Sequence, residues 1–398
     1  MSSDSVHTRA TPDARGASAR SLEDLLSFAQ GIVAEHVLPR AEEVDREARW
    51  PQEGIRALME AGLAGLHVPA HLGGHGQGLY ALARMTETIA LACPSTAMCF
   101  GMHCVATAVI AAKATPDHEE RYLRPIAEGR HLATLALSER GTGANFFLPA
   151  MRLAREGDSY RVQGEKQFVT NAAHADSYVI STEASDAAAE GEFSCLVLDA
   201  AAPGIAWGDA WRGLGMRGND SRSMRIDARV PAANLLGREG EQVWYVFEVV
   251  APYFLVAMAG VYLGVAQAAL AIAARHVDAR RHAHSGESVA QLPTVQHRVG
   301  ELWIAVERCR ALLHQAANQG DAGDPGAVLP LLASKVDAAE AAVHVTNEAM
   351  TLCGGSAFRE NGALARLMRD ARAGPVMAPT TDMLKLWIGR LTLGMPLL

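Results

Sequence analysis

The sequence predicts a mostly helical α+β protein made of three successive parts. Apolar residues recur at helical spacing from about residue 21 to 130, short strand-like segments follow between 131 and 237, and long helical patterns return from 238 to 398. Strands do not alternate with helices, so a doubly wound parallel sheet is excluded. The length of 398 residues suits several domains, and no internal repeat is present.

The first part is expected to be helical. Its segments LEDLLSFAQGIVAEHVLPRAEEV and EGIRALMEAGLAGL have helical spacing, and Pro and Gly clusters separate them. Residues 1–20 are expected to form a disordered tail. This tail lacks the apolar region of a secretory signal, and Asp4 and Asp13 argue against a transit peptide. We therefore expect a cytoplasmic protein.

The second part is expected to be a β domain, and the third a helical bundle. The segments MRLAREGDSYRVQGEKQFVTN, DSYVIST, FSCLVLDA and SMRIDARV contain alternating, β-branched or aromatic residues, which are typical of strands. The stretches VQHRVGELWIAVERCRALLHQAANQ and VLPLLASKVDAAEAAVHVTNEAMTLC then show helical patterns, with GDAGDPGA between them.

Two uncharged runs, residues 88–112 and 249–274, are long enough to span a membrane. The first contains Pro94 and His103, and the second contains Pro252 and Gln267. Neither run has an aromatic belt or a basic flank on one side. These features favour buried helices of a bundle over membrane spans.

Charge and cysteine content exclude further classes. The formal net charge is −8, which opposes the basic surface that nucleic-acid binding needs. The six cysteines are too sparse for a disulfide framework, and none forms a CxxC pair. The charge therefore disfavours nucleic-acid binding, and the cysteine content fits a reducing cytoplasm.

Several segments, in this order along the chain, carry a resemblance to a known family. They are GLAGLHVPAHLGGHGQG (62–78), LALSERGTGAN (135–145), GEKQFVTN (164–171), GLGMRGNDSRSMRIDARVPAANLLG (213–237), LCGGSAF (352–358) and LARLMRDARA (364–373). Together they resemble the acyl-CoA dehydrogenase flavoproteins, from about Leu22 to the last residue. The resemblance implies an N-terminal helical domain, a β-barrel-like middle domain and a C-terminal four-helix bundle.

The resemblance also implies the cofactor FAD. Ser138 matches a hydroxyl residue that faces the flavin ring, Phe168 an aromatic residue on the ring, and Thr170 a hydroxyl donor at flavin N5. A donor at N5 helps because hydride transfer places negative charge on the ring. Arg281, or Arg280 beside it, either offers a guanidinium to a pyrophosphate or is a solvated arginine at a helix end. The other implied flavin positions are Gly143, Gly354, Gly355 and Thr380.

The chain departs from the family at the catalytic base. The usual base is a glutamate shortly after the Arg-Asp-Ala segment, and the resemblance places Ala378 there. Some members carry it on the long apolar helix after the β domain, where this chain has Phe254. Neither side chain accepts a proton, so a base has to lie elsewhere. The candidates are Asp382, Glu248 and His103.

The resemblance places the acyl pocket at Ala144, Arg222, Phe254 and His103. His103 has a second interpretation, as a buried histidine hydrogen-bonded to a backbone carbonyl. Cys99, His103 and Cys104 lie close in sequence, but no second cluster accompanies them, so no metal site is expected.

These residues leave two enzymatic interpretations open. The first is FAD-dependent α,β-oxidation of an acyl thioester, bound to CoA or to an acyl carrier protein, with a non-standard base. The second is a flavin-dependent monooxygenase, an N-hydroxylase or a desulfinase-type reaction, because such relatives lack the glutamate. The charge of −8 disfavours a DNA-protective homologue. We expect a homotetramer or homodimer that binds neither nucleic acid nor membranes, with a redox partner that the sequence does not identify.

Overall fold

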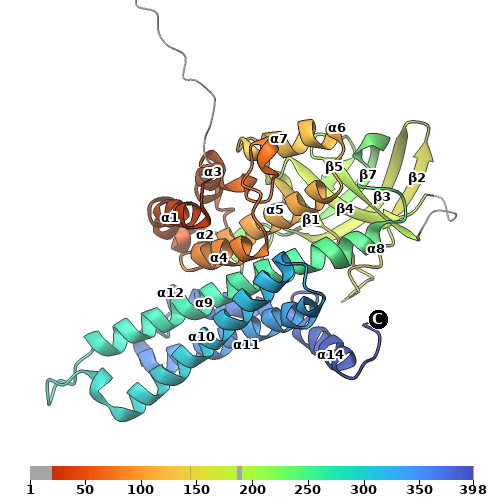
Figure 1. The fold of residues 1–398 in the computed structure, drawn as a ribbon. Helices are drawn as coiled ribbons and strands as arrows, with labels where there is room; N and C mark the ends of the chain where they lie inside the picture. The colour runs from red at the N-terminus through yellow and green to blue at the C-terminus, as the bar shows by residue number, and fades with distance from the viewer. Residues whose placement is uncertain (1–19, 144, 186–190, 398) are drawn as a thin grey trace, which may run out of the picture.

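A computed structural model describes residues 20–143, 145–185 and 191–397 (Figure 1). It confirms the predicted fold class, because helices, then strands, then helices follow one another along the chain. In Figure 1 the β part lies at one end of the molecule and the long helices extend away from it. The residues of the predicted tail, 1–19, lie outside the described residues.

The N-terminal part consists of helices around the buried helix α5. Every residue of α5 up to Ile110 is buried, and Pro94 at its first position ends the preceding turn and starts the helix. The helices of this part are α1 (Leu22–Ile32), α2 (Ala41–Arg46), α3 (Gln52–Glu60), α4 (Leu79–Ala90), α5 (Pro94–Ala112), α6 (Pro116–His118) and α7 (Arg124–Ala127).

The middle part contains two sheets that share a core. One sheet has the order β1-β4-β5, in which β1 pairs parallel to β4, and the other is the antiparallel sheet β2-β3-β7-β6. Side chains from both sheets, among them Tyr178 and Ile226, form one hydrophobic cluster. The strands are β1 (Ala133–Ala136), β2 (Arg152–Glu156), β3 (Ser159–Val169), β4 (Ser177–Glu183), β5 (Phe193–Asp199), β6 (Ile205–Trp207) and β7 (Arg222–Pro231).

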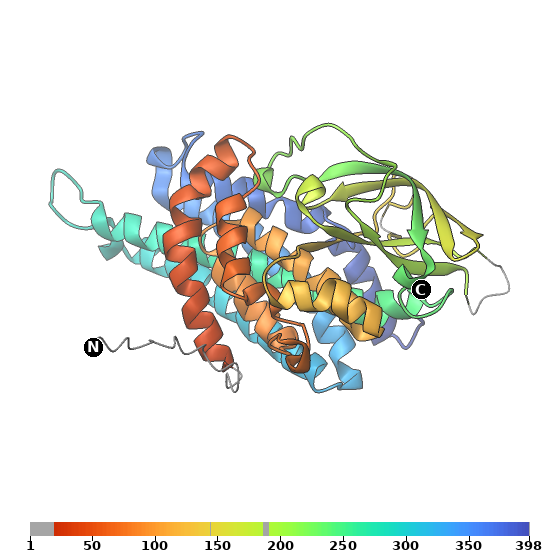
Figure 2. The same cartoon turned by 90° about the horizontal axis from the view of Figure 1, so that it is seen from above.

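The C-terminal part is built on three long helices that run side by side (Figures 1 and 2). A buried polar network links two of them to the N-terminal part, since Arg310 on α10 donates to Gln267 on α9 at 2.8 Å and to Glu87 on α4 at 3.0 Å. The helices are α8 (Gln242–Trp244), α9 (Ala251–Ala279), α10 (Pro293–Asp321), α11 (Val328–Cys353), α12 (Ala363–Ala371), α13 (Ala373–Val376) and α14 (Thr381–Thr392). A π-helical segment, Tyr245–Val250, joins α8 to α9.

The two long uncharged runs form helices that are mostly buried in the fold. In the most apolar stretch of α5, 89% of the residues are buried, and the corresponding value for the continuous helix Gln242–Ala279 is 78%. The first run is also split, because α4 ends at Ala90 and α5 begins at Pro94. This arrangement agrees with the interpretation of both runs as core helices.

Candidate active site

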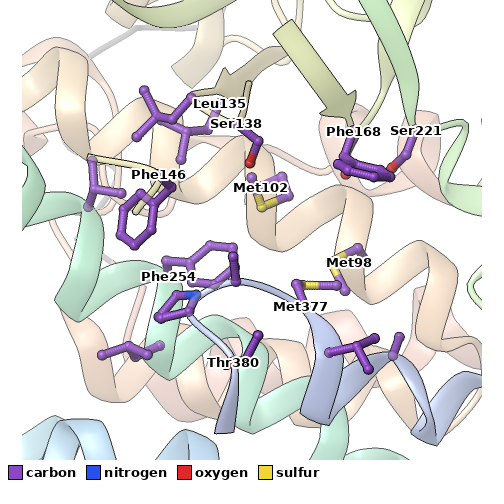
Figure 3. Close-up of a pocket in the computed structure, with 18 of the residues that line it drawn as sticks. Met98, Met102, Leu135, Ser138, Phe146, Phe168, Ser221, Phe254, Met377 and Thr380 are labelled. Atoms are coloured by element: carbon purple, nitrogen blue, oxygen red, sulfur yellow. The ribbon is translucent and has the colours of Figure 1, made fainter. Parts of the chain in front are cut away.

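A cavity of about 1020 Å³ lies where the three parts of the chain meet. Its walls come from the end of β1 and the following loop, the end of β3, the loop 211–221, α5, α9, α11, α13 with the residues around it up to 380, and α14. Apolar side chains dominate, including Met98 and Met102 on α5 and Phe254 on α9 (Figure 3). A cavity of this size and character is typical of a site for a cofactor or a small molecule.

Phe168 faces the cavity because the end of β3 is irregular. The register of β3 against β7 shifts between Lys166 and Val169, and Phe168 adopts a left-handed φ of 55°. Its side chain is 64% exposed and meets the edge of Trp211 at a centroid distance of 6.2 Å. An aromatic face that is free inside a cavity is suited to pack against a planar ring.

Left-handed backbone at residues other than glycine is concentrated in two segments beside the cavity. Asn171 follows Phe168 with a φ of 66°, and Met216 and Asp220 have φ values of 49° and 46°. The Asn171 N–H donates to the Asn219 carbonyl at 3.1 Å, so the two segments hold each other. Strained backbone persists only where its surroundings fix it, and it is concentrated at functional sites.

Polar groups gather on the same side of the cavity as Phe168 (Figure 3). The hydroxyl oxygens of Thr170 and Ser221 lie 3.0 Å apart. The Gln167 N–H donates to the Ser138 carbonyl at 2.8 Å, which ties the loop after β1 to the end of β3. The buried Oδ1 of Asn219, another lining residue, has no hydrogen-bond partner within the described residues. This side can therefore bind a ligand that carries both donors and acceptors.

Glu139 is the one carboxylate among the described lining residues, and it is neutralised within the wall. Its Oε1 accepts from Lys166 Nζ at 2.6 Å, and its Oε2 accepts from the Ala150 N–H at 2.8 Å. Burial lowers the pKa of Lys166 to about 8, and the charge of Glu139 opposes this shift. Among the same residues, the positive side chains are Arg140, Arg369 and Arg372.

Asp370 on α12 connects the cavity wall to the rest of the fold. Its buried carboxylate accepts from the Met216 N–H at 2.6 Å. The neighbouring Arg369 forms an ion pair with Asp45 on α2. One turn of α12 thus fixes the loop 211–221 relative to the N-terminal helices.

Asp370→Asn is expected to stabilise the protein more at pH 8 than at pH 5. Burial raises the pKa of Asp370 to about 6, so the stability that the protonated form provides is lost as the pH rises through 6. Asparagine keeps the acceptor for Met216 and cannot ionise. Relative to wild type, the variant's free energy of unfolding in urea should rise by about 1 kcal/mol between these pH values. A difference that is independent of pH would contradict this expectation.

Models of three protein-family domains match successive stretches of the chain. The acyl-CoA dehydrogenase N-terminal domain matches residues 21–130, the middle domain residues 134–228, and the C-terminal domain residues 253–393. The cyclohex-1-ene-1-carbonyl-CoA dehydrogenase of Geobacter metallireducens is 31% identical over 369 residues, which cover 92% of this chain and 96% of the relative. The chain belongs to the acyl-CoA dehydrogenase family.

Further relatives and solved structures agree with this family. The acryloyl-CoA reductase (NADH) of Anaerotignum propionicum is 28% identical, covering 93% of this chain and 94% of the relative. The acyl-CoA dehydrogenase structure from Geobacillus kaustophilus has a TM-score of 0.86 and 25% identity, with 93% and 97% covered. Butyryl-CoA dehydrogenase from Megasphaera elsdenii has a TM-score of 0.88 and 24% identity, with 94% and 98% covered. Family membership makes the protein a flavoprotein oxidoreductase.

The cavity brings together seven positions to which the acyl-CoA dehydrogenase resemblance assigns a role. The five positions predicted to bind flavin are Ser138, Gly143, Phe168, Thr170 and Thr380. The other two are Phe254, predicted to lie in the acyl pocket, and Ala378, at the family's base position. Phe168 lies across the cavity from Thr380 (Figure 3). Their roles stay predictions.

His103 does not line the cavity, because both of its ring nitrogens are engaged in the interior. Nδ1 accepts from the Ala133 N–H at 3.1 Å, and Nε2 lies 3.0 Å from the Ala64 carbonyl oxygen. Burial lowers the pKa of His103 to about 4, so the ring is neutral near pH 7. The imidazole joins α5 to β1, which is the second of the two interpretations that the sequence left open.

The other candidate bases and Arg222 also lie outside the lining of the cavity. Glu248 and Asp382 are exposed on the outer sides of their helices and do not line the cavity. Arg222 also lies outside the cavity lining and donates to Asp220 Oδ1 at 2.7 Å. Ala144, the remaining predicted residue of the acyl pocket, lies outside the described residues.

Arg281, Gly354 and Gly355, predicted to bind the flavin nucleotide, lie apart from this cavity. They occur where α9 and α11 end, toward the tip of the long helices in Figure 1. A side-chain Cβ at Gly354 would lie 4.0 Å from Arg280 Nη1, so these two segments are neighbours. None of them lines the cavity of the same chain.

The structure adds lining residues that the sequence analysis did not select. They come from four separate elements and are mostly aromatic or sulfur-containing: Met98, Met102, Phe146, Trp211 and Trp387. Each occurs in an ordinary helical or loop pattern, so only the fold brings them together.

Proposed function

We propose that the protein is an FAD-dependent oxidoreductase that oxidises the acyl chain of a thioester between its α and β carbons. The observation that carries this proposal is the two-sided cavity. Phe168 and the hydroxyl groups of Ser138, Thr170 and Ser221 occupy one side, and Met98, Met102 and Phe254 supply an apolar surface. This combination suits a flavin ring that lies beside an acyl chain.

The residues present fit the cofactor. When bound, FAD supplies an acceptor for two electrons as a hydride. Phe168 would pack on the ring, and the hydroxyls of Thr170 and Ser138 would donate to its polar edge. The Asn171–Asn219 hydrogen bond holds the backbone beside Thr170, and the Gln167–Ser138 hydrogen bond holds that of Ser138. These donors are therefore preorganised and need little rearrangement during the reaction.

The acyl chain would be bound by burial of its apolar surface, at roughly 25 cal/mol per Å². Arg140 and Arg372 are exposed lining residues, and their guanidinium groups suit the phosphates of CoA or of a carrier protein's phosphopantetheine arm. The proposal therefore includes both carriers.

The proton that leaves the α carbon requires an acceptor. Ala378 occupies the usual position, and Glu139 is engaged by Lys166, so the proposal includes a non-standard base. The Ala378 methyl group in the cavity wall also favours a second candidate. This is a flavin reaction that needs no such base, namely monooxygenation, N-hydroxylation or desulfination of a small molecule.

The test is anaerobic mixing of the flavin-loaded protein with a panel of acyl-CoA and carrier-bound acyl thioesters, followed through the visible flavin band. Bleaching with one of them supports the first proposal. A spectrum that shifts on binding but does not bleach, together with oxygen consumption once an external reductant is added, favours the second. No spectral response to any thioester contradicts an acyl thioester as the ligand.

Phe168→Ala is expected to weaken flavin binding by about 2- to 10-fold, because an aromatic contact contributes about 0.5–1.5 kcal/mol beyond its buried area. Phe28→Ala on α1, an exposed aromatic residue outside the cavity lining, is the matched control. Flavin affinity is measured by fluorescence titration of the apoprotein. Equal affinities of the two variants would contradict the role of Phe168.

We also propose a homodimer or homotetramer that shares its FAD sites. Arg281, Gly354 and Gly355 lie toward the tip of the long helices, apart from the cavity of their own chain. If they bind the nucleotide part of an FAD, the flavin ring of that FAD lies in the cavity of a second copy of the chain. Light scattering of the flavin-loaded protein tests this arrangement. A monomer with full FAD content would overturn it.

A further inference from the structure

Lysine is rare in this chain, and two of its positions are deeply buried. The sequence contains four lysines and 32 arginines. Lys113 and Lys385 pair with glutamates near the surface, whereas Lys166 and Lys335 are completely buried. Burial of an ammonium is costly unless its donors are all hydrogen-bonded. The two buried lysines therefore require a structural reason.

Lys335 on α11 is surrounded by α13 and by the loop that joins α13 to α14. Its Nζ donates to the carbonyl oxygens of Gly374 at 2.8 Å, Met377 at 3.0 Å and Pro379 at 2.9 Å. These are the three donors that an ammonium has, so its hydrogen-bonding capacity is fully used. Met377 and Pro379 line the cavity, and Ala378 lies between them.

Helix α13 also approaches α11 too closely for a side chain at Gly374. A Cβ there would lie 2.9 Å from Ala339 Cβ, and Ala339 lies one helical turn after Lys335. Two consecutive turns of α11 thus hold the segment 374–379. The position of the Ala378 wall depends on this contact between α11 and residues 374–379.

Lys166 on β3 makes a similar set of hydrogen bonds to the loop after β1, which forms another wall of the cavity. Its Nζ donates to the carbonyl oxygens of Leu137 at 3.2 Å and Ser181 at 2.7 Å, and to Glu139 Oε1 at 2.6 Å. Leu137 and Glu139 flank Ser138, and all three line the cavity. The two lysines therefore act on the loop that carries Ser138 and on the loop that carries Ala378.

We propose that Lys166 and Lys335 are positioning residues, each of which holds one wall of the cavity by gathering the carbonyl groups of a lining loop around a compact ammonium. Lysine is required because its three donors point in tetrahedral directions, while the guanidinium of arginine is larger, planar and forked. A chain with eight times as many arginines as lysines keeps lysine at these two positions. This proposal rests on the proposed function in one respect only, namely that an acyl thioester is the ligand bound in the cavity.

The test compares Lys335→Met, Lys335→Arg and the control Lys385→Met with wild type. Lys385 lies on α14 and pairs with Glu340 of α11 at the surface. Its replacement therefore removes a lysine contact of α11 without changing a hydrogen bond to residues 374–379. Amide hydrogen exchange of peptides covering residues 374–384 is measured first. The change in the visible flavin spectrum on titration with an acyl-CoA is measured second. Burial lowers the pKa of Lys335 to about 7, so both experiments are run at pH 6.5, where the ammonium predominates.

We expect exchange in residues 374–384 to become at least tenfold faster in both Lys335 variants, while peptides elsewhere change less than twofold. The Kd for acyl-CoA should rise at least tenfold, the spectral change on binding should differ from that of wild type, and the flavin should be retained. Lys385→Met should match wild type. If Lys335→Met does not fold, Lys335→Arg decides by the same measurements.

Wild-type exchange and wild-type Kd in a folded Lys335 variant would overturn the proposal. Faster exchange spread evenly over the protein would also overturn it, since that result describes a loss of general stability. If wild type itself shows no response to acyl-CoA, the proposed substrate class fails, and the local exchange result still decides the role of Lys335.

Discussion

Replacing Ala378 by glutamate is expected to raise the rate of acyl-thioester oxidation by about 10²- to 10⁴-fold, the usual contribution of a positioned general base. Ala378 lines the cavity, so a longer side chain at this position can enter it. The carbonyls of Met377 and Pro379 on either side accept from Lys335, whose pKa is about 7, so below pH 7 a cation lies close behind the new carboxylate and favours its charged form. The rate is measured as anaerobic bleaching of the flavin band by the thioester that binds best.

The control for this prediction is Ala378→Gln, which has the same shape as glutamate and cannot accept the proton. A second readout is exchange of the α proton with solvent deuterium, which requires a base but no electron transfer. Glutamate should accelerate this exchange and glutamine should not. Equal rates in the two variants would show that residue 378 does not reach the α carbon.

The fold was predictable from the sequence because each part has one dominant periodicity. Helical spacing in LEDLLSFAQGIVAEHV and alternation in SMRIDARV are local properties, and the structure has α1 and β7 there. The pairing of strands was not predictable in the same way. β1 lies parallel to β4, and the two are separated by β2 and β3 along the chain. Such pairing depends on long-range packing, which leaves no local signal.

The candidate site was predictable where its residues lie in short motifs. Ser138, Phe168 and Thr170 occur in segments that resemble the family, and the structure brings them to one cavity. His103 was ambiguous because one histidine among apolar residues has the same local pattern whether it binds a ligand or the backbone. Trp211 was missed since its side chain meets Phe168 only through the tertiary fold.

Replacing Glu139 by glutamine is expected to lower the free energy of unfolding by about 3–5 kcal/mol at pH 7, the usual cost of leaving one partner of a buried ion pair unpaired. Lys166 is completely buried, and the Glu139 side chain is 7% exposed, so water cannot replace the lost charge. The amide oxygen of glutamine can still accept from the Ala150 N–H, as Oε2 does now. The substitution therefore removes the negative charge of residue 139 while nearly keeping the shape of its side chain. Urea denaturation of the apoprotein measures the loss.

The pH dependence of this loss identifies its cause. In wild type the pKa of Lys166 is lowered by burial to about 8, and removal of the opposing carboxylate lowers it further. Below the variant's pKa, its folded state must keep an unpaired ammonium in the interior, so the loss is complete. Between the variant's pKa and about 8, the folded variant has lost this proton while the folded wild type and both unfolded chains keep it. The variant's stability therefore rises with pH and the loss shrinks, and above 8 the two stabilities change in parallel. Asp227→Asn, which breaks the exposed pair with Arg161, should show a small loss with no such decrease. A loss in Glu139→Gln that is the same at pH 7 and pH 9 would mean that the carboxylate supports the wall by its hydrogen bonds alone, and not by neutralising Lys166.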